Sequence, residues 1–226
     1  FDVYATLQPG REFGGGFYDF FLIGDDRFCF CIGNVAGQGV QAALIMSVIK
    51  TIIESRAGDD FSTASIFTHV NEQLSAVNPA SMLVMLFMGI LNIKTGKLIY
   101  SSAGHKGPYL KRQAAGVERL DRTHGPLIGT ARGMVYGEDT IALSKNDMLL
   151  LCSVGVAPAG IDGDHGHCAK RLQALIASAE YESPEHIVRA VISAANKIRG
   201  AADQLGDLTL LAVQFAVRHP PGRAAP

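Results

Sequence analysis

Residues 14–39 read GGGFYDFFLIGDDRFCFCIGNVAGQG and predict a β-hairpin that runs into a glycine-rich turn. Tyr18–Ile23 and Phe28–Val35 are the expected strands, and the Gly-Asp-Asp of residues 24–26 is the turn signal between them. Because side chains alternate across a strand, the second strand is expected to have two different faces. One face carries Phe28, Phe30 and Ile32, and the other carries Cys29, Cys31 and Gly33.

Further elements follow from the spacing of apolar residues and from residues that cap helices. We expect helices over 40–53, from about 62 to 77 with Ser62 as its cap, and from 184 to the residue before Gly200. We expect strands over 83–93, 98–102, 108–111, 135–143, 148–153 and 208–217.

Two of these helices carry specific expectations about burial. The helix over 40–53 is apolar on nearly every side, which predicts burial over most of its surface. The last helix has Ser183 as its cap and Pro184 at its first position. Its expected buried stripe consists of Ile187, Val191, Ala194 and Ile198.

The order of these elements and the composition bound the class of protein. Antiparallel strands interleaved with pairs of helices are typical of a layered α+β domain, and 226 residues suit one such domain. A net charge of -1 gives no field that would draw the chain to nucleic acid or to anionic lipid. No apolar run reaches the ~20 residues of a membrane span, and no signal peptide is visible. We therefore expect a cytoplasmic protein with no nucleic-acid or membrane partner.

Four stretches of the chain carry a resemblance to a known family. They are residues 14–19 (GGGFYD), 32–40 (IGNVAGQGV), 153–156 (SVGV) and 206–211 (GDLTLL). They resemble GGDFYD, IGDVSGKGV, TDGV and DDMTLL of the SpoIIE/RsbU-like branch of the metal-dependent (PPM, protein phosphatase 2C-like) serine/threonine phosphatases. Further matches lie at residues 102–105, 125–129 and 145–151, so the resemblance spans nearly the whole chain.

The resemblance implies a particular architecture and a place in a larger protein. The fold would be a four-layer α-β-β-α sandwich of two antiparallel sheets flanked by helices, over residues 1–217, with a disordered tail over 218–226. Because the chain opens within an expected strand and lacks an initiator Met, we expect it to be the C-terminal output domain of a longer regulator. It is similar to the output domain of RssB-type response regulators, and relatives imply a homodimer formed through a region N-terminal to this chain.

The resemblance also implies the place of a metal site, and this chain departs from the family there. The family holds two divalent ions on an Asp in each of the four stretches, and those ions activate the water that attacks phosphoserine or phosphothreonine. Here the four positions are Gly16, Asn34, Val154 and Gly206. Because Mg²⁺ and Mn²⁺ need several carboxylate oxygens, we expect no metal, no cofactor and no catalytic residue.

Two acids survive beside the lost ligands. Asp19 is expected to face solvent or to pair with a basic residue, and Asp207 to cap the turn into the last strand. Either could in principle hold one weakly bound cation.

Other polar residues are candidates for a metal-binding or catalytic site. The stretch DGDHGHC at residues 162–168 has transition-metal ligands but reads as a mobile surface loop. His105 reads as a histidine at a strand end that backbone groups satisfy. Cys31 and Cys152 read as buried structural thiols that come near each other in the old cleft.

The sequence thus predicts a catalytically inactive phosphatase-like domain, a pseudophosphatase. It would bind a protein partner in bacterial signalling, such as a sigma-factor, anti-sigma or anti-sigma-antagonist pathway. The alternative is a metal-dependent serine/threonine phosphatase with a rearranged metal site, using Mg²⁺ or Mn²⁺ and dephosphorylating an anti-sigma-factor antagonist.

Overall fold

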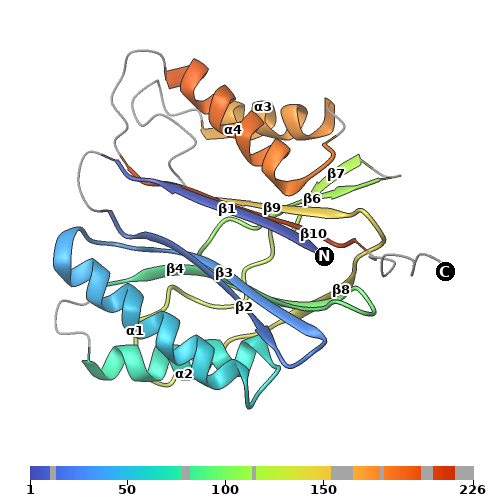
Figure 1. The fold of residues 1–226 in the computed structure, drawn as a ribbon. Coiled ribbons are helices and arrows are strands. Elements are labelled where there is room, and N and C mark those ends of the chain that lie inside the picture. The colour runs from blue at the N-terminus through green and yellow to red at the C-terminus, as the bar shows by residue number, and fades with distance from the viewer. Residues whose placement is uncertain are drawn as a thin grey trace, which may run out of the picture.

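The two sheets of the protein face each other, and each has a pair of helices on its outer side (Figure 1). The computed structural model describes residues 1–10, 14–77, 82–113, 116–153, 165–178, 181–199 and 206–216. This is the α-β-β-α sandwich that the sequence predicts, and that prediction of the fold class is confirmed.

Both sheets are antiparallel and have five strands. The first sheet has the order β1 (Asp2–Gln8), β10 (Leu208–Gln214), β9 (Met148–Cys152), β6 (Tyr109–Arg112) and β7 (Gly116–Arg119). The second has the order β2 (Gly16–Ile23), β3 (Arg27–Val35), β4 (Val84–Asn92), β5 (Lys97–Ala103) and β8 (Asp139–Ala142). The helices are α1 (Gly39–Ala57), α2 (Thr63–Val77), α3 (His165–Ser178) and α4 (Pro184–Arg199).

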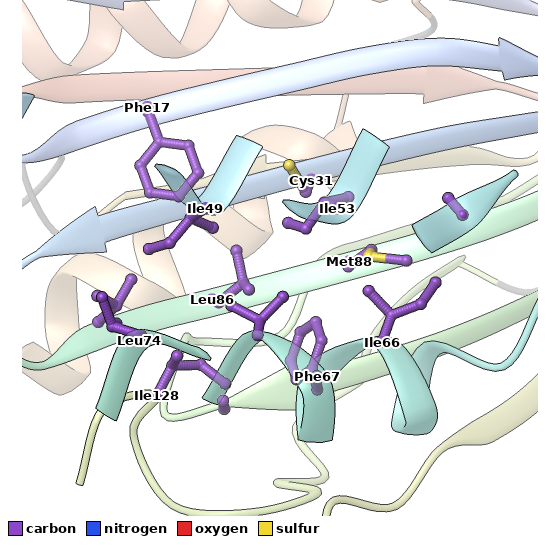
Figure 2. Close-up of a cluster of buried hydrophobic side chains, with 14 of the residues drawn as sticks. Phe17, Cys31, Ile49, Ile53, Ile66, Phe67, Leu74, Leu86, Met88 and Ile128 are labelled. Atoms are coloured by element: carbon purple, nitrogen blue, oxygen red, sulfur yellow. The ribbon is translucent and has the colours of Figure 1, made fainter. Parts of the chain in front are cut away.

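Three apolar layers hold these elements together. The middle layer lies between the sheets and includes Phe28, Phe30, Phe87, Leu151 and Leu211. An outer layer packs α1 and α2 on the second sheet, and Figure 2 shows Cys31 and Met88 of the strands meeting Ile49, Ile53 and Phe67 of the helices. The other outer layer packs α3 and α4 on the first sheet. The two faces predicted for β3 therefore lie in two different layers, as the alternation requires.

The predicted caps are present at two helices. The Ser62 hydroxyl accepts a hydrogen bond from the Ser65 amide at 3.2 Å, at the start of α2. The Ser183 hydroxyl accepts one from the His186 amide at 3.3 Å, at the start of α4. Each cap satisfies an amide that the first helical turn leaves without a carbonyl partner.

The expectation that the first helix is buried on most sides is wrong. In α1 Val40 is 76% exposed, Leu44 is 61% exposed and Val48 is 37% exposed. The helix lies on the outside of the second sheet, so only the face with Ala42, Ile49 and Ile53 is covered. The described residues leave an apolar stripe uncovered along the rest of this helix.

Other differences have local causes. The strand expected over 135–143 is reduced to β8, because the amide of Tyr136 bonds to Thr68 of α2 instead of to a strand. Among the α4 side chains that the structure describes, the buried ones are Pro184, Ile187, Val188, Val191 and Ala195, so Ala195 takes the place predicted for Ala194. The side chain of Ile198 lies outside the described residues.

Two elements were not predicted, namely β7 and α3. Because α3 begins at His165, residues 165–168 are helical, which corrects the predicted surface loop there; residues 162–164 lie outside the described residues. Gly200, Val217 and the predicted tail over 218–226 also lie outside them. None of the described helices is long and apolar enough to span a membrane.

Candidate functional site where strands of both sheets end

Two of the four degenerate positions lie directly opposite each other. Gly16 at the start of β2 pairs with Asn34 near the end of β3. Asn34 is on the same face of β3 as Ile32, which packs in the layer between the sheets. Both positions therefore face the space between the two sheets, at one end of the sandwich.

The first sheet contributes Ser153 and Thr209 to the same end. Ser153 follows β9, and Thr209 is near the start of β10, two residues before the interior-facing Leu211 and therefore on the same face. The Ser153 hydroxyl donates to the Asp207 carbonyl at 3.0 Å and accepts the Thr209 amide at 2.8 Å. The Ser153 amide donates to the Thr209 carbonyl at 2.9 Å, so these two strand ends are tied together.

The Asp207 carboxylate links three segments of the chain. It accepts hydrogen bonds from the Gly10 amide at 3.1 Å and from the Gly16 amide at 2.9 Å. It therefore fixes the end of β1 and the start of β2 against the start of β10. The predicted role was a cap on its own turn, and the structure corrects it, since the amides come from other parts of the chain.

The space at Gly16 is already filled by neighbouring side chains. A Cβ atom there would lie 2.7 Å from Thr209 Oγ1 and 2.9 Å from the Asp207 Cβ. Both distances are shorter than contacts that folded proteins accommodate without a shift, and Thr209 is fully buried. At Gly206, by contrast, a Cβ atom would have no neighbour within 4 Å among the described residues.

The described residues do not fit two bridged divalent ions. Gly16 and Gly206 have no side-chain oxygen, and Asn34 has a neutral amide. Val154 lies outside the described residues. Within the described part of the chain no three His, Cys, Asp or Glu side chains gather closely enough to hold an ion. The charge of two divalent ions needs several carboxylates close together, and among the described residues only Asp207 provides one at this end of the sandwich.

Asp19 lies on the opposite face of the second sheet. It pairs with Cys31, which is packed beneath α1 and α2, and its carboxylate forms an ion pair with Lys50 of α1 at 3.3 Å. This is the pairing with a basic residue that the sequence predicts. Because Asp19 and Asp207 are on opposite sides of that sheet, they do not form one cation site.

The prediction that Cys31 and Cys152 approach each other is wrong. Cys31 belongs to the layer under α1 and α2, whereas Cys152 packs against the layer under α3 and α4. Both sheets separate them. Burial raises the pKa of each thiol to about 12, and it also raises the pKa of Cys29 well above its ordinary value. These thiols are neutral at pH 7 and are not nucleophiles.

His105 is buried at the end of β5 and its Nδ1 donates to the Lys106 carbonyl at 2.7 Å. A carbonyl only accepts, so the ring proton is on Nδ1. The pKa of His105 is lowered to about 4, chiefly by burial. The positive charges of Arg119 and Lys106 also lower it, whereas the hydrogen bond to the Lys106 carbonyl opposes the shift. His105 is thus a neutral structural residue at pH 7.

Replacement of His105 by Gln is expected to reduce the loss of folding free energy that occurs as pH falls from 6.5 toward 4. The folded state resists protonation of His105, so stability is fully present above the unfolded pKa of 6.5 and is lost as pH falls from there toward 4. The loss attributable to His105 is about 3 kcal/mol over this window. Urea unfolding at pH 7 and pH 4.5 measures it, with exposed His186→Gln as the control. Equal slopes for His105→Gln and the parent chain would contradict this assignment.

Ser153 and Thr209 are the site residues that the sequence analysis missed. Both occur inside matched stretches, SVGV and GDLTLL, one residue before Val154 and three residues after Gly206. A hydroxyl at each of these positions is the signal that could have found them. Thr209 Oγ1 is also buried without a hydrogen-bond partner among the described residues, next to the position where Gly16 lacks a side chain.

Two face-to-face antiparallel sheets, a helix pair outside each, and a polar site where strands of both sheets end define the protein phosphatase 2C class of fold. The phosphatase domain of SpoIIE from Bacillus subtilis has this fold and superposes with a TM-score of 0.79 at 14% identity, covering 95% of this chain and 63% of that one. The chain belongs to the Stage II sporulation protein E (SpoIIE) family, whose model matches residues 24–216.

Two curated relatives are similar in sequence. Protein IcfG of Synechocystis is 26% identical over 184 residues, which cover 70% of this chain and 29% of IcfG. Phosphoserine phosphatase RsbU of Bacillus subtilis is 26% identical over 155 residues, which cover 69% of this chain and 46% of RsbU. The matched region is thus less than half of either relative.

Proposed function

We propose that this chain is a pseudophosphatase, a phosphatase-fold regulatory domain without catalytic activity that binds a protein partner in bacterial signalling. We place it in the cytoplasm, in a pathway of sigma factors, anti-sigma factors or anti-sigma-factor antagonists. The observation that carries the proposal is the filled space at Gly16, where Thr209 and Asp207 occupy the room that a metal-binding side chain would need.

The chemistry of the site supports the absence of turnover. A two-metal mechanism needs carboxylates that hold both ions and an activated water between them. Asp207 already accepts hydrogen bonds from two backbone amides, so its oxygens are partly committed to holding the fold. A carboxylate used in this way stabilises the folded chain without any ion.

The surface of α1 supports a protein partner. Its uncovered stripe contains Val40, Ala43, Leu44 and Val48, all exposed on one side of the helix. Contiguous exposed apolar surface is typical of interaction sites in folded proteins. The similarity to RsbU, a phosphoserine phosphatase, supports a place in a phosphorylation-dependent pathway.

Calorimetric titration with Mn²⁺ and Mg²⁺ tests the proposal, together with turnover of a phosphoserine peptide. We expect no binding heat at millimolar metal and no turnover, with the RsbU phosphatase domain run beside it as the active control. Micromolar metal binding with phosphate release would establish the alternative, a phosphatase with a rearranged metal site.

A further inference from the structure

A groove of about 620 Å³ lies between α4 and β1, on the outer side of the first sheet. Figure 1 shows α4 along β1 at this side of the molecule, and the two elements are in contact. Its lining consists of Tyr4, Thr6, Gln8, Arg189, Ile192, Ser193, Asn196 and Lys197. The site described above lies between the sheets, so this groove is a separate feature.

The two charged side chains that line the groove, Arg189 and Lys197, are both cationic. None of the lining residues is acidic, and Lys197 forms no ion pair with the described residues. Arg189 forms an ion pair with Glu185 at 2.7 Å, but the two side chains are 67% and 45% exposed. Exposed pairs of this kind contribute little, so Arg189 can exchange Glu185 for another anion.

The two cations are separated by the length of the groove. Lys197 is two helical turns beyond Arg189, which places the two positions ~12 Å apart along the helix axis. Tyr4 and Gln8 of β1 are four positions apart, which is ~13 Å along the strand. Arg189 lies on the N-terminal half of α4, and Lys197 extends the groove toward the α4 C-terminus.

The strand beside the groove, β1, is paired on one side in the part of the chain that the structure describes. Within the described residues β1 pairs only with β10, so it is an edge strand of its sheet. Edge strands bind extended peptides through main-chain hydrogen bonds, and alternate side chains of such a peptide fall on one face of the sheet. Side chains four residues apart in that peptide would be ~13 Å apart on the α4 side.

We propose that the groove between α4 and β1 binds an extended acidic segment of a partner protein, with carboxylates four residues apart at Arg189 and Lys197. The inference rests on the proposed function in so far as that function supplies a protein partner. A small molecule fits this groove less well than a peptide does, because small-molecule sites enclose most of the surface of their ligand. Four of the α4 residues that line the groove are exposed, so the groove is open to solvent.

Fluorescence anisotropy on the 226-residue chain tests the proposal. The probe is a fluorescein-labelled nonapeptide of Thr and Val with Glu at positions 3 and 7. We expect binding that weakens at least tenfold when both Glu residues are replaced by Gln, or when Lys197→Glu is introduced. The matched control is Lys94→Glu, the same charge change in the exposed turn between β4 and β5, which is expected to change the affinity less than twofold.

Several outcomes would overturn the inference. They are no binding at 1 mM protein, equal affinity for the Glu and Gln peptides, or equal effects of Lys197→Glu and Lys94→Glu. Displacement of the peptide by ADP at lower concentrations than by an unlabelled Glu peptide would assign the groove to a small molecule instead. Amide chemical shifts of Tyr4, Thr6 and Gln8 on titration with the Glu peptide confirm the location.

The outcome is separable from that of the proposed function. Phosphate release from a phosphoserine peptide would disprove the pseudophosphatase, yet peptide binding that depends on Lys197 would still stand. Failure of the peptide to bind, with no metal binding and no turnover, would leave the pseudophosphatase in place and remove only this groove as its contact.

Discussion

Replacement of Gly16 by Asp is expected to lower the free energy of unfolding by about 3 kcal/mol. The new Cβ atom would lie 2.7 Å from Thr209 Oγ1 and 2.9 Å from the Asp207 Cβ, so a buried side chain must move. The new carboxylate would also stand beside Asp207, and two carboxylates without a cation repel each other. Urea unfolding at pH 7 measures the loss.

Two further variants separate the steric cause from a general effect of an added acid. Gly206→Asp has no described neighbour within 4 Å of its Cβ, so we expect a change in the free energy of unfolding within about 0.5 kcal/mol. Thr209→Ala removes the nearest atom, so in combination with Gly16→Asp it should recover part of the loss. Equal destabilisation by Gly16→Asp and Gly206→Asp would contradict the filled space.

The sequence predicted most of the individual strands and helices because their signals are local, whereas the four-layer arrangement was implied by the family resemblance. The alternation of Phe28, Phe30 and Ile32 with Cys29 and Cys31 sets two faces on one strand, and those faces lie in separate apolar layers. A run of apolar residues does not tell which of them are covered. In α1 the apolar residues surround the helix, yet the sheet covers only one side, and Leu44 on another side is 61% exposed.

The site was predicted only in part because its contacts are distant in sequence. The family resemblance predicts an Asp where this chain has Gly16 and Gly206. The bond between the Gly16 amide and Asp207 joins residues 191 positions apart, so no local pattern reveals that Asp207 takes up this space. The wrong prediction that Cys31 lies near Cys152 has a related cause. Alternation along a strand separates its two faces, but which apolar layer each face joins depends on the elements that pack against it.

A variant that restores all four acids is expected to depend on Mn²⁺ for its stability. It combines Gly16→Asp, Asn34→Asp, Val154→Asp and Gly206→Asp. The new acids at positions 16 and 34 lie at the same end of the sandwich as Asp207, and carboxylates without a cation repel one another, so the metal-free variant should melt at a lower temperature than the parent chain. A cation that binds only the folded state adds about 2.7 kcal/mol at a hundred times its dissociation constant. For a domain of this size that corresponds to a rise in melting temperature of roughly 5 to 10 °C.

Scanning calorimetry with and without 2 mM Mn²⁺ measures this rise. Phosphate release from a phosphoserine peptide shows whether the four-acid variant is also catalytically active. A charge-free control with Asn at positions 16, 154 and 206 has side chains of nearly the same size as the four-acid variant and should show no rise. If the four-acid variant does not fold, the variant that keeps Gly16 and restores the other three acids avoids the clash with Thr209. An equal Mn²⁺ effect on the Asn control and the Asp variants would mean that the metal binds elsewhere. It would also mean that these four positions do not account for the lost site.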